Sequence, residues 1–259
     1  MSDHGPAALI ELPPSMSPPP RAGGRTFSAT ILLITDGLHL PDVSHQSAPE
    51  RLMTRLQAVL RAVPPGAIAV QLRNRHVSTG ALHRLAQDLR ALTLHYAAPL
   101  LINDRLDVAL AVGADGVHLP GKGLPVQNAR ALLGPGRVLS AAAHSLPEAR
   151  MALLAGADAV TLSPIWDTPS KPPRPDGKDD VRPLSPAVLS AAVAQLGRPY
   201  GLPIFALGGI DSLSRVRECA AQGARVACLR ALLSGEEDEV AARAVDFVAA
   251  VAGATSTAA

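Results

Sequence analysis

The chain has 259 residues, and its 24 lysines and arginines nearly balance its 22 aspartates and glutamates, which gives a formal net charge of +2 at pH 7. So small a net charge argues against a nucleic-acid-binding protein and leaves any anion-binding site to a local cluster of residues. Hydrophobic residues form 47% of the sequence. That share can fill the core of one domain, but the chain is too short for a second large one.

The sequence gives no sign of a membrane partner. It contains no apolar run of about 18 residues, and its N-terminus lacks a basic region followed by an apolar stretch. We therefore expect a soluble, cytoplasmic protein. The two cysteines, Cys219 and Cys228, have no spacing that suits a disulfide framework or a metal site, so we expect both to be buried.

The N-terminal segment has a composition of its own. It contains ELPPSMSPPPRAGG and offers too little apolar surface to order itself. We expect a disordered tail over residues 1–25, one folded domain over 26–253, and a short disordered tail over 254–259.

Eight short apolar runs follow, and each is followed by a segment of helical character. The runs are ILLITD (31–36), AIAVQLR (67–73), PLLIND (99–104), GVHLP (116–120), RVLSAAAH (137–144), DAVTLSPI (158–165), PIFALGG (203–209) and RVACLRAL (225–232). Helices are predicted over 49–63, 78–95, 105–112, 125–133, 145–155, 185–196, 212–222 and 239–252. Buried parallel strands that alternate with helices indicate an α/β fold, and eight such units predict a single (β/α)8 TIM barrel.

Local signals support two of the helix starts. Ser145 and Glu148 form an S-x-x-E capping box at the fifth helix, and Ser212 is a candidate cap for the seventh. After the sixth apolar run, the polar segment DTPSKPPRPDGKDDVRP (167–183) is long enough to be a lid or a disordered loop.

A TIM barrel carries its active site at the carboxyl ends of its strands, where this sequence places many polar residues. The glycine pair Gly208 and Gly209 ends the seventh run. Barrels often bind phosphate after strands seven and eight, although a tight turn would use the same two residues. His118 alternates with apolar neighbours, so we expect it to point into the barrel, as a packed and hydrogen-bonded residue rather than a catalyst.

Six strings resemble, in order and spacing, the thiamine phosphate synthase and TenI family over about residues 27–250. They are LLITDG, QLRNRH, LINDRLDVALAVGADGVHLP, AHSLPEAR, GADAVTLSPIWDTPSK and IFALGGI. The resemblance implies a barrel that binds a thiazole phosphate. In the synthase branch it also implies a pyrimidine pyrophosphate with Mg²⁺, and attack of the thiazole nitrogen on a carbocation-like centre as pyrophosphate leaves.

The resemblance implies a role for several residues. Gln71, Arg73 and Arg75 match the family's Q-x-R-x-K, with arginine in place of lysine, and Asn103 and Asp104 match an Asn-Asp pair whose aspartate binds magnesium. Further matches are the pyrophosphate loop, at Thr168, Ser170 and Lys171, and the thiazole-phosphate loop, at Gly208 and Gly209. Arg230 replaces a small residue in the eighth loop, where it could reach a phosphate or only fill space.

Two departures bear on the reaction. Where synthases read GVHLGQ-x-D, this chain reads GVHLPGKG, so Gly121 replaces the glutamine and Gly123 the second magnesium-binding aspartate. Where synthases read GVSTHS, it reads SAAAHS, so Ala142 replaces the serine that serves pyrophosphate. One carboxylate with substrate phosphates and water can still hold Mg²⁺, but losing both groups weakens the case for a synthase.

The TenI branch has an LPSG-like segment similar to LPGKG, and some members convert a thiazole carboxylate phosphate to its aromatic tautomer. That proton transfer needs no metal cofactor, and His144 matches the histidine assigned to it. From the sequence we prefer a TenI-like thiazole tautomerase, with His144, Asp104 and Arg73 as catalytic residues. The alternatives are a divergent, Mg²⁺-dependent synthase and a non-catalytic regulator that binds phosphate ligands. A homo-oligomer is possible.

Each assignment also has a structural alternative. His144 could be a hydrogen-bonding residue at a strand end, Asp104 could stabilise a helix start through the helix dipole, and Lys171 could be a solvated loop charge. Arg73 could form an ion pair, although a buried guanidinium in a barrel mouth favours an anionic ligand.

Overall fold

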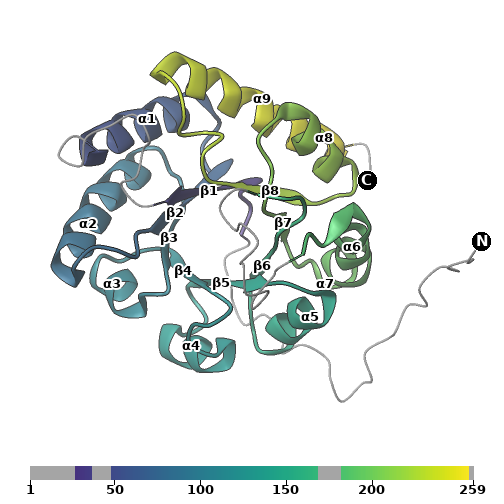
Figure 1. The fold of residues 1–259 in the computed structure, drawn as a ribbon. Helices are drawn as coiled ribbons and strands as arrows, with labels where there is room; N and C mark the ends of the chain where they lie inside the picture. Colours follow the sequence, from purple (N-terminus) through teal and green to yellow (C-terminus); the bar gives the residue numbers. More distant parts are fainter. Residues whose placement is uncertain (1–26, 37–47, 169–181, 257–259) are drawn as a thin grey trace, which may run out of the picture.

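The structure is a computed structural model that describes residues 27–36, 48–168 and 182–256. Within them, eight parallel strands close into a barrel in sequence order, and the first strand pairs with both the second and the eighth (Figure 1). The strands are β1 (Ile31–Asp36), β2 (Ile68–Arg73), β3 (Leu100–Asn103), β4 (Gly116–Leu119), β5 (Val138–Ala143), β6 (Ala159–Leu162), β7 (Ile204–Ala206) and β8 (Arg225–Cys228). The predicted single TIM barrel is confirmed.

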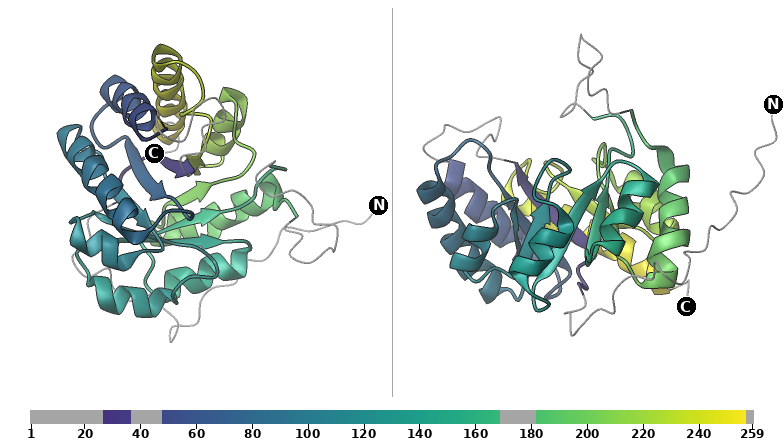
Figure 2. Two further views of the ribbon diagram at one scale, coloured as in Figure 1. Left: turned by 60° about the vertical axis from the view of Figure 1, so that its left-hand side comes forward. Right: turned by 90° about the horizontal axis from the view of Figure 1, so that it is seen from below.

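The helices form a ring around the strands, as the views of Figure 2 also show. They are α1 (Ala48–Ala62), α2 (Thr79–His95), α3 (Leu106–Ala111), α4 (Val126–Leu133), α5 (Leu146–Leu154), α6 (Ser185–Ala192), α7 (Arg198–Tyr200), α8 (Leu213–Ala221) and α9 (Glu237–Ser256). The long helix α9 packs against both α1 and α8, and so covers the seam between the first and last strands.

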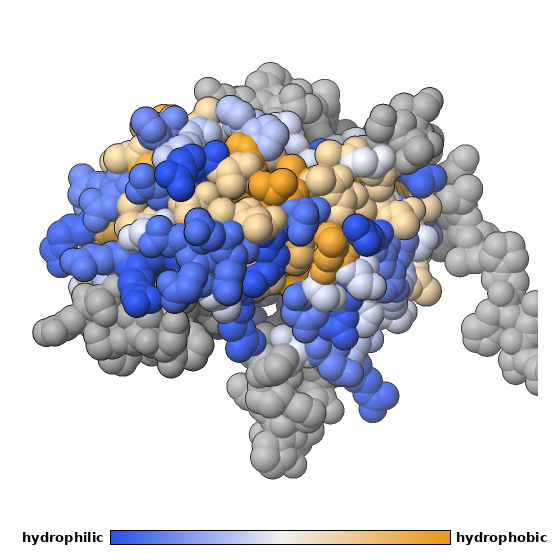
Figure 3. Space-filling model, turned by 90° about the horizontal axis from the view of Figure 1, so that it is seen from above, coloured by the Kyte–Doolittle hydropathy of each residue, from blue (hydrophilic) through white to orange (hydrophobic). Residues whose placement is uncertain are grey.

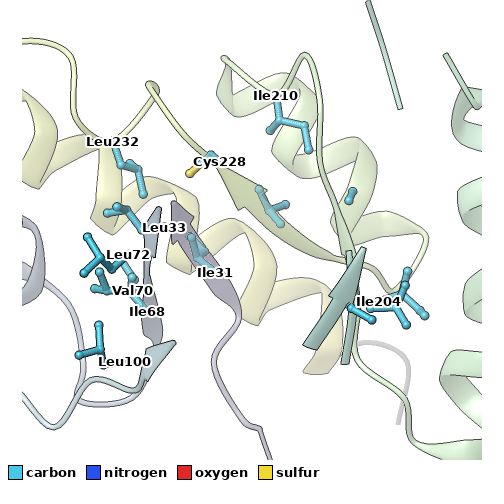
Figure 4. Packing of buried hydrophobic residues seen from close by; sticks show 14 of the residues in the cluster. Ile31, Leu33, Ile68, Val70, Leu72, Leu100, Ile204, Ile210, Cys228 and Leu232 are labelled. Atoms are coloured by element: carbon cyan, nitrogen blue, oxygen red, sulfur yellow. The ribbon is translucent and has the colours of Figure 1, made fainter. Parts of the chain in front are cut away.

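Alternation along each strand divides the apolar residues into two cores. Ile31 and Leu33 belong to the cluster between strands and helices, part of which Figure 4 shows, whereas Leu32 and Ile34 belong to the cluster inside the barrel. Successive side chains of a strand point to opposite faces of the sheet. Every second residue of each strand is therefore available to the barrel interior.

The amino-terminal end of the barrel interior is closed by aromatic and cationic packing. The rings of Phe27 and Phe205 lie 5.5 Å apart, and the Arg225 guanidinium lies over the Phe205 ring at 5.8 Å. Arg225 also donates hydrogen bonds to the carbonyl oxygens of Phe27 and Ala29. This closure leaves the opposite end of the barrel to form the cavity.

The predicted strands and helices appear in the predicted order, with small differences at their ends. The predicted sixth helix, 185–196, ends as α6 at Ala192 and continues as a π-helical turn over Val193–Gly197 before α7. The helix α9 continues to Ser256, three residues beyond the predicted domain boundary at 253, and Ala254 packs against the core. The division into a folded domain and two disordered tails stays a prediction. Residues 1–26, 169–181 and 257–259 lie outside the described residues.

Both predicted caps are present, one with an altered partner. The Ser145 side chain accepts a hydrogen bond from the Glu148 amide, and the Ser212 side chain accepts one from the Arg215 amide. In a regular capping box the Glu148 carboxylate would accept a hydrogen bond from the Ser145 amide. Here it accepts from the amide of the preceding residue, His144, at 2.8 Å. That bond ties the carboxyl end of β5 to the first turn of α5.

The outer surface is mixed in polarity. The face carrying α1, α8 and α9 shows apolar residues among hydrophilic ones (Figure 3), and Val245 of α9 is 44% exposed; the homo-oligomer stays a prediction. Cys219 and Cys228 are buried as expected, and burial raises the pKa of each thiol to about 12. Within the described residues, no helix is both long and apolar enough to cross a membrane.

Two aspartates hold the amino-terminal ends of β3 and β5 in the same way. The Asp115 carboxylate accepts from the Leu100 amide at 2.9 Å and from Arg90 at 2.6 Å. Asp158 follows an identical Gly-Ala pair and accepts from the Leu139 amide at 2.8 Å and from Arg130. Each carboxylate thus satisfies a buried amide and a partly buried guanidinium at once.

We predict that Asp158→Ala lowers the free energy of unfolding by about 1–3 kcal/mol, because the Leu139 amide loses its acceptor in a buried position. Denaturant unfolding followed by circular dichroism measures the difference. The matched control is Asp88→Ala, at an exposed position of α2, which should stay within about 0.5 kcal/mol of the unaltered protein. Equal losses in both variants would contradict the role given to Asp158.

Candidate active site

A cavity of about 1450 Å³ opens at the carboxyl ends of the strands. Every predicted site residue that the structure describes lines it: Gln71, Arg73, Arg75, Asn103, Asp104, His144, Thr168, Gly208, Gly209 and Arg230. Ser170 and Lys171 lie outside the described residues. The fold therefore brings together residues that are spread over more than half of the sequence.

The floor of the cavity consists of inward-pointing polar side chains on the even-numbered strands. Gln71 of β2, His118 of β4 and Thr161 of β6 are each 5% exposed or less. Gln71 donates to the Asn103 side-chain oxygen at 3.1 Å. Within the described part of the chain, the Gln71 carbonyl oxygen and the Thr161 hydroxyl are buried without a hydrogen-bond partner. Buried polar atoms of this kind are costly, and a ligand with polar groups would satisfy them.

His118 is neutral at neutral pH. Burial, and secondly the positive charge of Arg73, lower the pKa of His118 to about 4. Its Nδ1 lies 3.0 Å from the Ser140 hydroxyl oxygen. The expectation that His118 points into the barrel and is hydrogen-bonded is confirmed, and it also borders the cavity.

His144, at the end of β5, is held in one tautomer. Its Nδ1 lies 2.6 Å from the Ser163 carbonyl oxygen. A carbonyl oxygen only accepts, so Nδ1 carries the proton and Nε2 of the neutral ring is free to act as a base. A Cβ atom at Gly121 would lie 3.5 Å from that Nε2, in van der Waals contact, so the glycine leaves this side of the ring uncovered.

Asp104 is an exposed carboxylate at the mouth of the cavity, presented by an unusual backbone. Its φ is +65°, and its amide donates to the His118 carbonyl oxygen at 2.8 Å, which fixes the turn after β3. A Cβ atom at Gly123 would lie only 2.7 Å from the Asp104 carboxylate oxygen. The turn at residues 120–123 therefore packs directly against this carboxylate.

The fit of a magnesium ion can be tested against these donors. No group of three or more acidic, histidine or cysteine side chains able to hold a metal occurs among the described residues. Asp104 supplies one carboxylate, and Mg²⁺ often takes one or two carboxylates with substrate phosphates and water. The described residues fit an ion that a phosphorylated substrate brings with it, but not a site built from protein ligands alone.

The turn after β7 lies against the loop after β6. Gly208 and Gly209 have φ values of +99° and +70°, so a residue with a side chain would be strained at either position. A Cβ atom at Gly209 would lie 2.7 Å from the Asp167 carbonyl oxygen. The tight turn proposed from the sequence is present, and it also borders the cavity. Phosphate binding there stays a prediction.

Cationic side chains outnumber acidic ones around the cavity. Its lining includes Arg73, Arg75, Arg105, Lys122 and Arg230, against Asp104, Glu148 and Asp211. The Arg73 amide donates to the buried Thr35 hydroxyl oxygen at 3.0 Å, so the strand that carries Arg73 is fixed by its neighbour. Because Arg105 is already ion-paired with Asp107, the excess of positive charge is small, and it suits an anionic ligand such as a phosphate.

Several lining residues were absent from the sequence prediction. Thr161 could have been found, because it lies two residues after Ala159 and therefore on the same inward face of β6. Lys122 carries no signal beyond its charge, and Glu148 is marked in the sequence only as the partner of Ser145 in a capping box. Ser163 acts through its carbonyl oxygen on His144, a contact between strands that no local pattern encodes.

The low pKa of His118 predicts a pH-dependent stability. Between the unfolded pKa of about 6.5 and the folded pKa of about 4, the unfolded chain binds a proton that the folded chain does not, so the free energy of unfolding falls as pH falls. Over that window the contribution is up to about 3 kcal/mol. Denaturant unfolding of the unaltered protein and His118→Gln at several pH values measures it. Parallel pH profiles for the two proteins would contradict the prediction.

Comparisons with known proteins agree with this geometry. A sequence model described as thiamine monophosphate synthase matches residues 43–232. The chain is 36% identical over 218 residues to a putative thiamine-phosphate synthase of Geobacter sulfurreducens, covering 83% of this chain and 92% of the relative. It is 32% identical over 250 residues to a thiamine-phosphate synthase of Roseiflexus sp. strain RS-1, covering 95% of each.

A solved structure gives the same result. The thiamine phosphate pyrophosphorylase of Pyrococcus furiosus superposes with a TM-score of 0.69 at 26% identity, covering 88% of this chain and 98% of that one. The family match spans strands β2 to β8 and the cavity between them. With the family pattern, the relatives and the barrel in agreement, the chain belongs to the thiamine monophosphate synthase family.

Proposed function

We propose that the protein is a thiamine phosphate synthase, which joins a pyrimidine pyrophosphate to a thiazole phosphate. This reverses the preference drawn from the sequence, which placed a tautomerase first. Two observations support the change: the relatives named above carry the synthase name, and the cavity has the size and charge for two anionic substrates.

The cavity size and charge carry the proposal. A pocket for one drug-sized ligand measures about 300–1,000 Å³, whereas this cavity measures about 1450 Å³. A tautomerase needs to hold one thiazole phosphate, which leaves much of this space unfilled. A second substrate accounts for the extra space, and the cationic side chains of Arg73, Arg75, Lys122 and Arg230 in the lining suit its pyrophosphate.

The reaction breaks the carbon–oxygen bond between the pyrimidine methylene and pyrophosphate and forms a carbon–nitrogen bond from the thiazole. Pyrophosphate leaves with the bonding electron pair, and the thiazole nitrogen lone pair fills the vacancy on carbon. The protein must therefore position two substrates and stabilise negative charge on the leaving group.

The residues divide these tasks by position. Gln71 and Thr161 at the floor offer a buried acceptor and a hydroxyl to the pyrimidine ring. Arg73 and Arg75 face the pyrophosphate, and the turn at Gly208 and Gly209 offers backbone amides to the thiazole phosphate. Mg²⁺, when bound, adds positive charge to the leaving group, and Asp104 is the carboxylate that would hold it.

The first test is product formation. The unaltered protein, given both substrates and Mg²⁺, should release inorganic pyrophosphate and thiamine phosphate in equal amounts. Arg73→Met should lower the turnover about 100- to 1,000-fold, because one charged donor to the leaving group is lost. A coupled pyrophosphate assay with chromatography of thiamine phosphate measures both products.

Arg84→Met is the matched control, since Arg84 is an exposed arginine of α2 that does not line the cavity. It should keep the unaltered rate. Absence of thiamine phosphate from the unaltered protein, at any Mg²⁺ concentration, would contradict the proposal. If the thiazole also fails to tautomerise while both ligands bind, the non-catalytic regulator is the surviving alternative.

A thiazole tautomerase is the second candidate, and the geometry of His144 favours it. The Ser163 carbonyl fixes the proton on Nδ1 and leaves Nε2 as a base on the side of the ring that Gly121 leaves uncovered. A neutral imidazole near the thiazole suits a proton transfer, and that reaction requires no metal. The missing carboxylate at Gly123 and the missing hydroxyl at Ala142 do not affect it.

His144→Asn tests this candidate. If His144 moves the proton, the variant should aromatise thiazole carboxylate phosphate about 100- to 10,000-fold more slowly, with thiazole phosphate affinity unchanged within about threefold. Ultraviolet absorbance follows the tautomer, and calorimetric titration measures the affinity. A variant that works at the unaltered rate would exclude His144 as the base.

A further inference from the structure

The loops after β6 and β7 are joined beyond the ends of their strands. Regular pairing ends at Leu162 and Ala206, yet the Ile165 amide donates to the Leu207 carbonyl at 2.9 Å and the Trp166 amide to the Gly208 carbonyl at 3.2 Å. The two loops therefore extend side by side up to the residues that border the cavity.

One side chain from outside the cavity contacts both loops. Arg215 of α8 donates to the Gly209 carbonyl oxygen, and its guanidinium carbon lies 5.4 Å from the centre of the Trp166 ring. Asp211 lies 3.4 Å from the same guanidinium nitrogen. A guanidinium can donate in its plane and stack on an aromatic ring with its face, so Arg215 can hold the glycine turn and Trp166 together.

The two loops lie in close contact. A Cβ atom at Gly209 would lie 2.8 Å from the Trp166 Cβ and 2.7 Å from the Asp167 carbonyl oxygen, so only glycine fits at this position. Because backbone hydrogen bonds also join the two loops, movement of the glycine turn is transmitted to Trp166. Thr168, two residues after Trp166, borders the cavity. Movement of the glycine turn can therefore change the position of a residue in the cavity wall.

We propose that Arg215 is a positioning residue that couples the two anion subsites of the cavity. The inference rests on the proposed function, which gives the thiazole phosphate to the glycine turn and the pyrophosphate to Arg73 and Arg75 in the same cavity. Phosphate bound at the turn fixes Gly209, and Arg215 then restrains Trp166. The restrained loop holds Thr168, which borders the cavity, for the pyrophosphate. Each ligand raises the affinity for the other by the same factor, because coupling between sites is reciprocal.

The chain provides its own reporter of this contact. Trp166 is its single tryptophan, and its ring is stacked against the guanidinium that holds the turn. Thiazole phosphate should change the tryptophan fluorescence. In calorimetric titrations with Mg²⁺ present, saturating thiazole phosphate should raise the affinity for inorganic pyrophosphate about fivefold or more.

Arg215→Gln should bind each ligand alone with an affinity within about threefold of the unaltered protein, but the increase caused by the second ligand should disappear. Arg215→Lys keeps a charged donor for the Gly209 carbonyl and loses the flat stacking face, so it should retain part of the coupling. The matched control is Arg217→Gln, at an exposed position of the same helix, which should keep all of it.

The results separate this inference from the function on which it rests. Full coupling in Arg215→Gln, or independent binding of both ligands to the unaltered protein, would overturn the inference and leave the synthase in place. Failure of the unaltered protein to bind either ligand would overturn both. A loss of single-ligand affinity in Arg215→Gln that equals the loss of coupling would show a structural role only.

Discussion

A closed barrel of parallel strands accepts only every second residue of each strand into its interior, and the rest of this structure depends on that constraint. Along β2 the inward series runs from Ala69 through Gln71 to Arg73, so polarity rises toward the carboxyl end. At the other end, apolar side chains and Arg225 fill the interior of the barrel. Ligands can enter from one side only, where the inward positions are polar.

That constraint also explains what could be predicted from the sequence. The eight apolar runs predicted the barrel, and position at the strand ends together with the family motifs predicted the residues around the cavity, from Gln71 on β2 to Arg230 after β8. The contacts that orient those residues could not be predicted, because they join strands by tertiary geometry. The Ser163 carbonyl at His144 and the Arg215 side chain at Gly209 have no spacing pattern in one sequence.

The choice between synthase and tautomerase shows how the two kinds of information differ. From the sequence, Gly123 and Ala142 count as missing groups, which favours the simpler reaction. In three dimensions the same turn packs against Asp104, and the cavity beside it has more room than one thiazole phosphate requires. A comparison of motifs shows which groups are lost, whereas the size of the cavity is visible only in the assembled site.

Loss of a carboxylate next to a metal ligand has a physical consequence for anion binding. Each carboxylate in such a site attracts Mg²⁺ but repels pyrophosphate. Removal of one carboxylate therefore weakens the binding of Mg²⁺, and it strengthens the attraction between pyrophosphate and the cationic side chains of the protein. Here the turn that packs against Asp104 carries Lys122 and no acidic residue. Fixed side-chain cations need little reorganisation as charge develops on a leaving group. If the protein acts as the proposed synthase, the cations at the carboxyl ends of β2, β4 and β8 would therefore supply charge stabilisation that a second metal-binding carboxylate provides indirectly, through its ion.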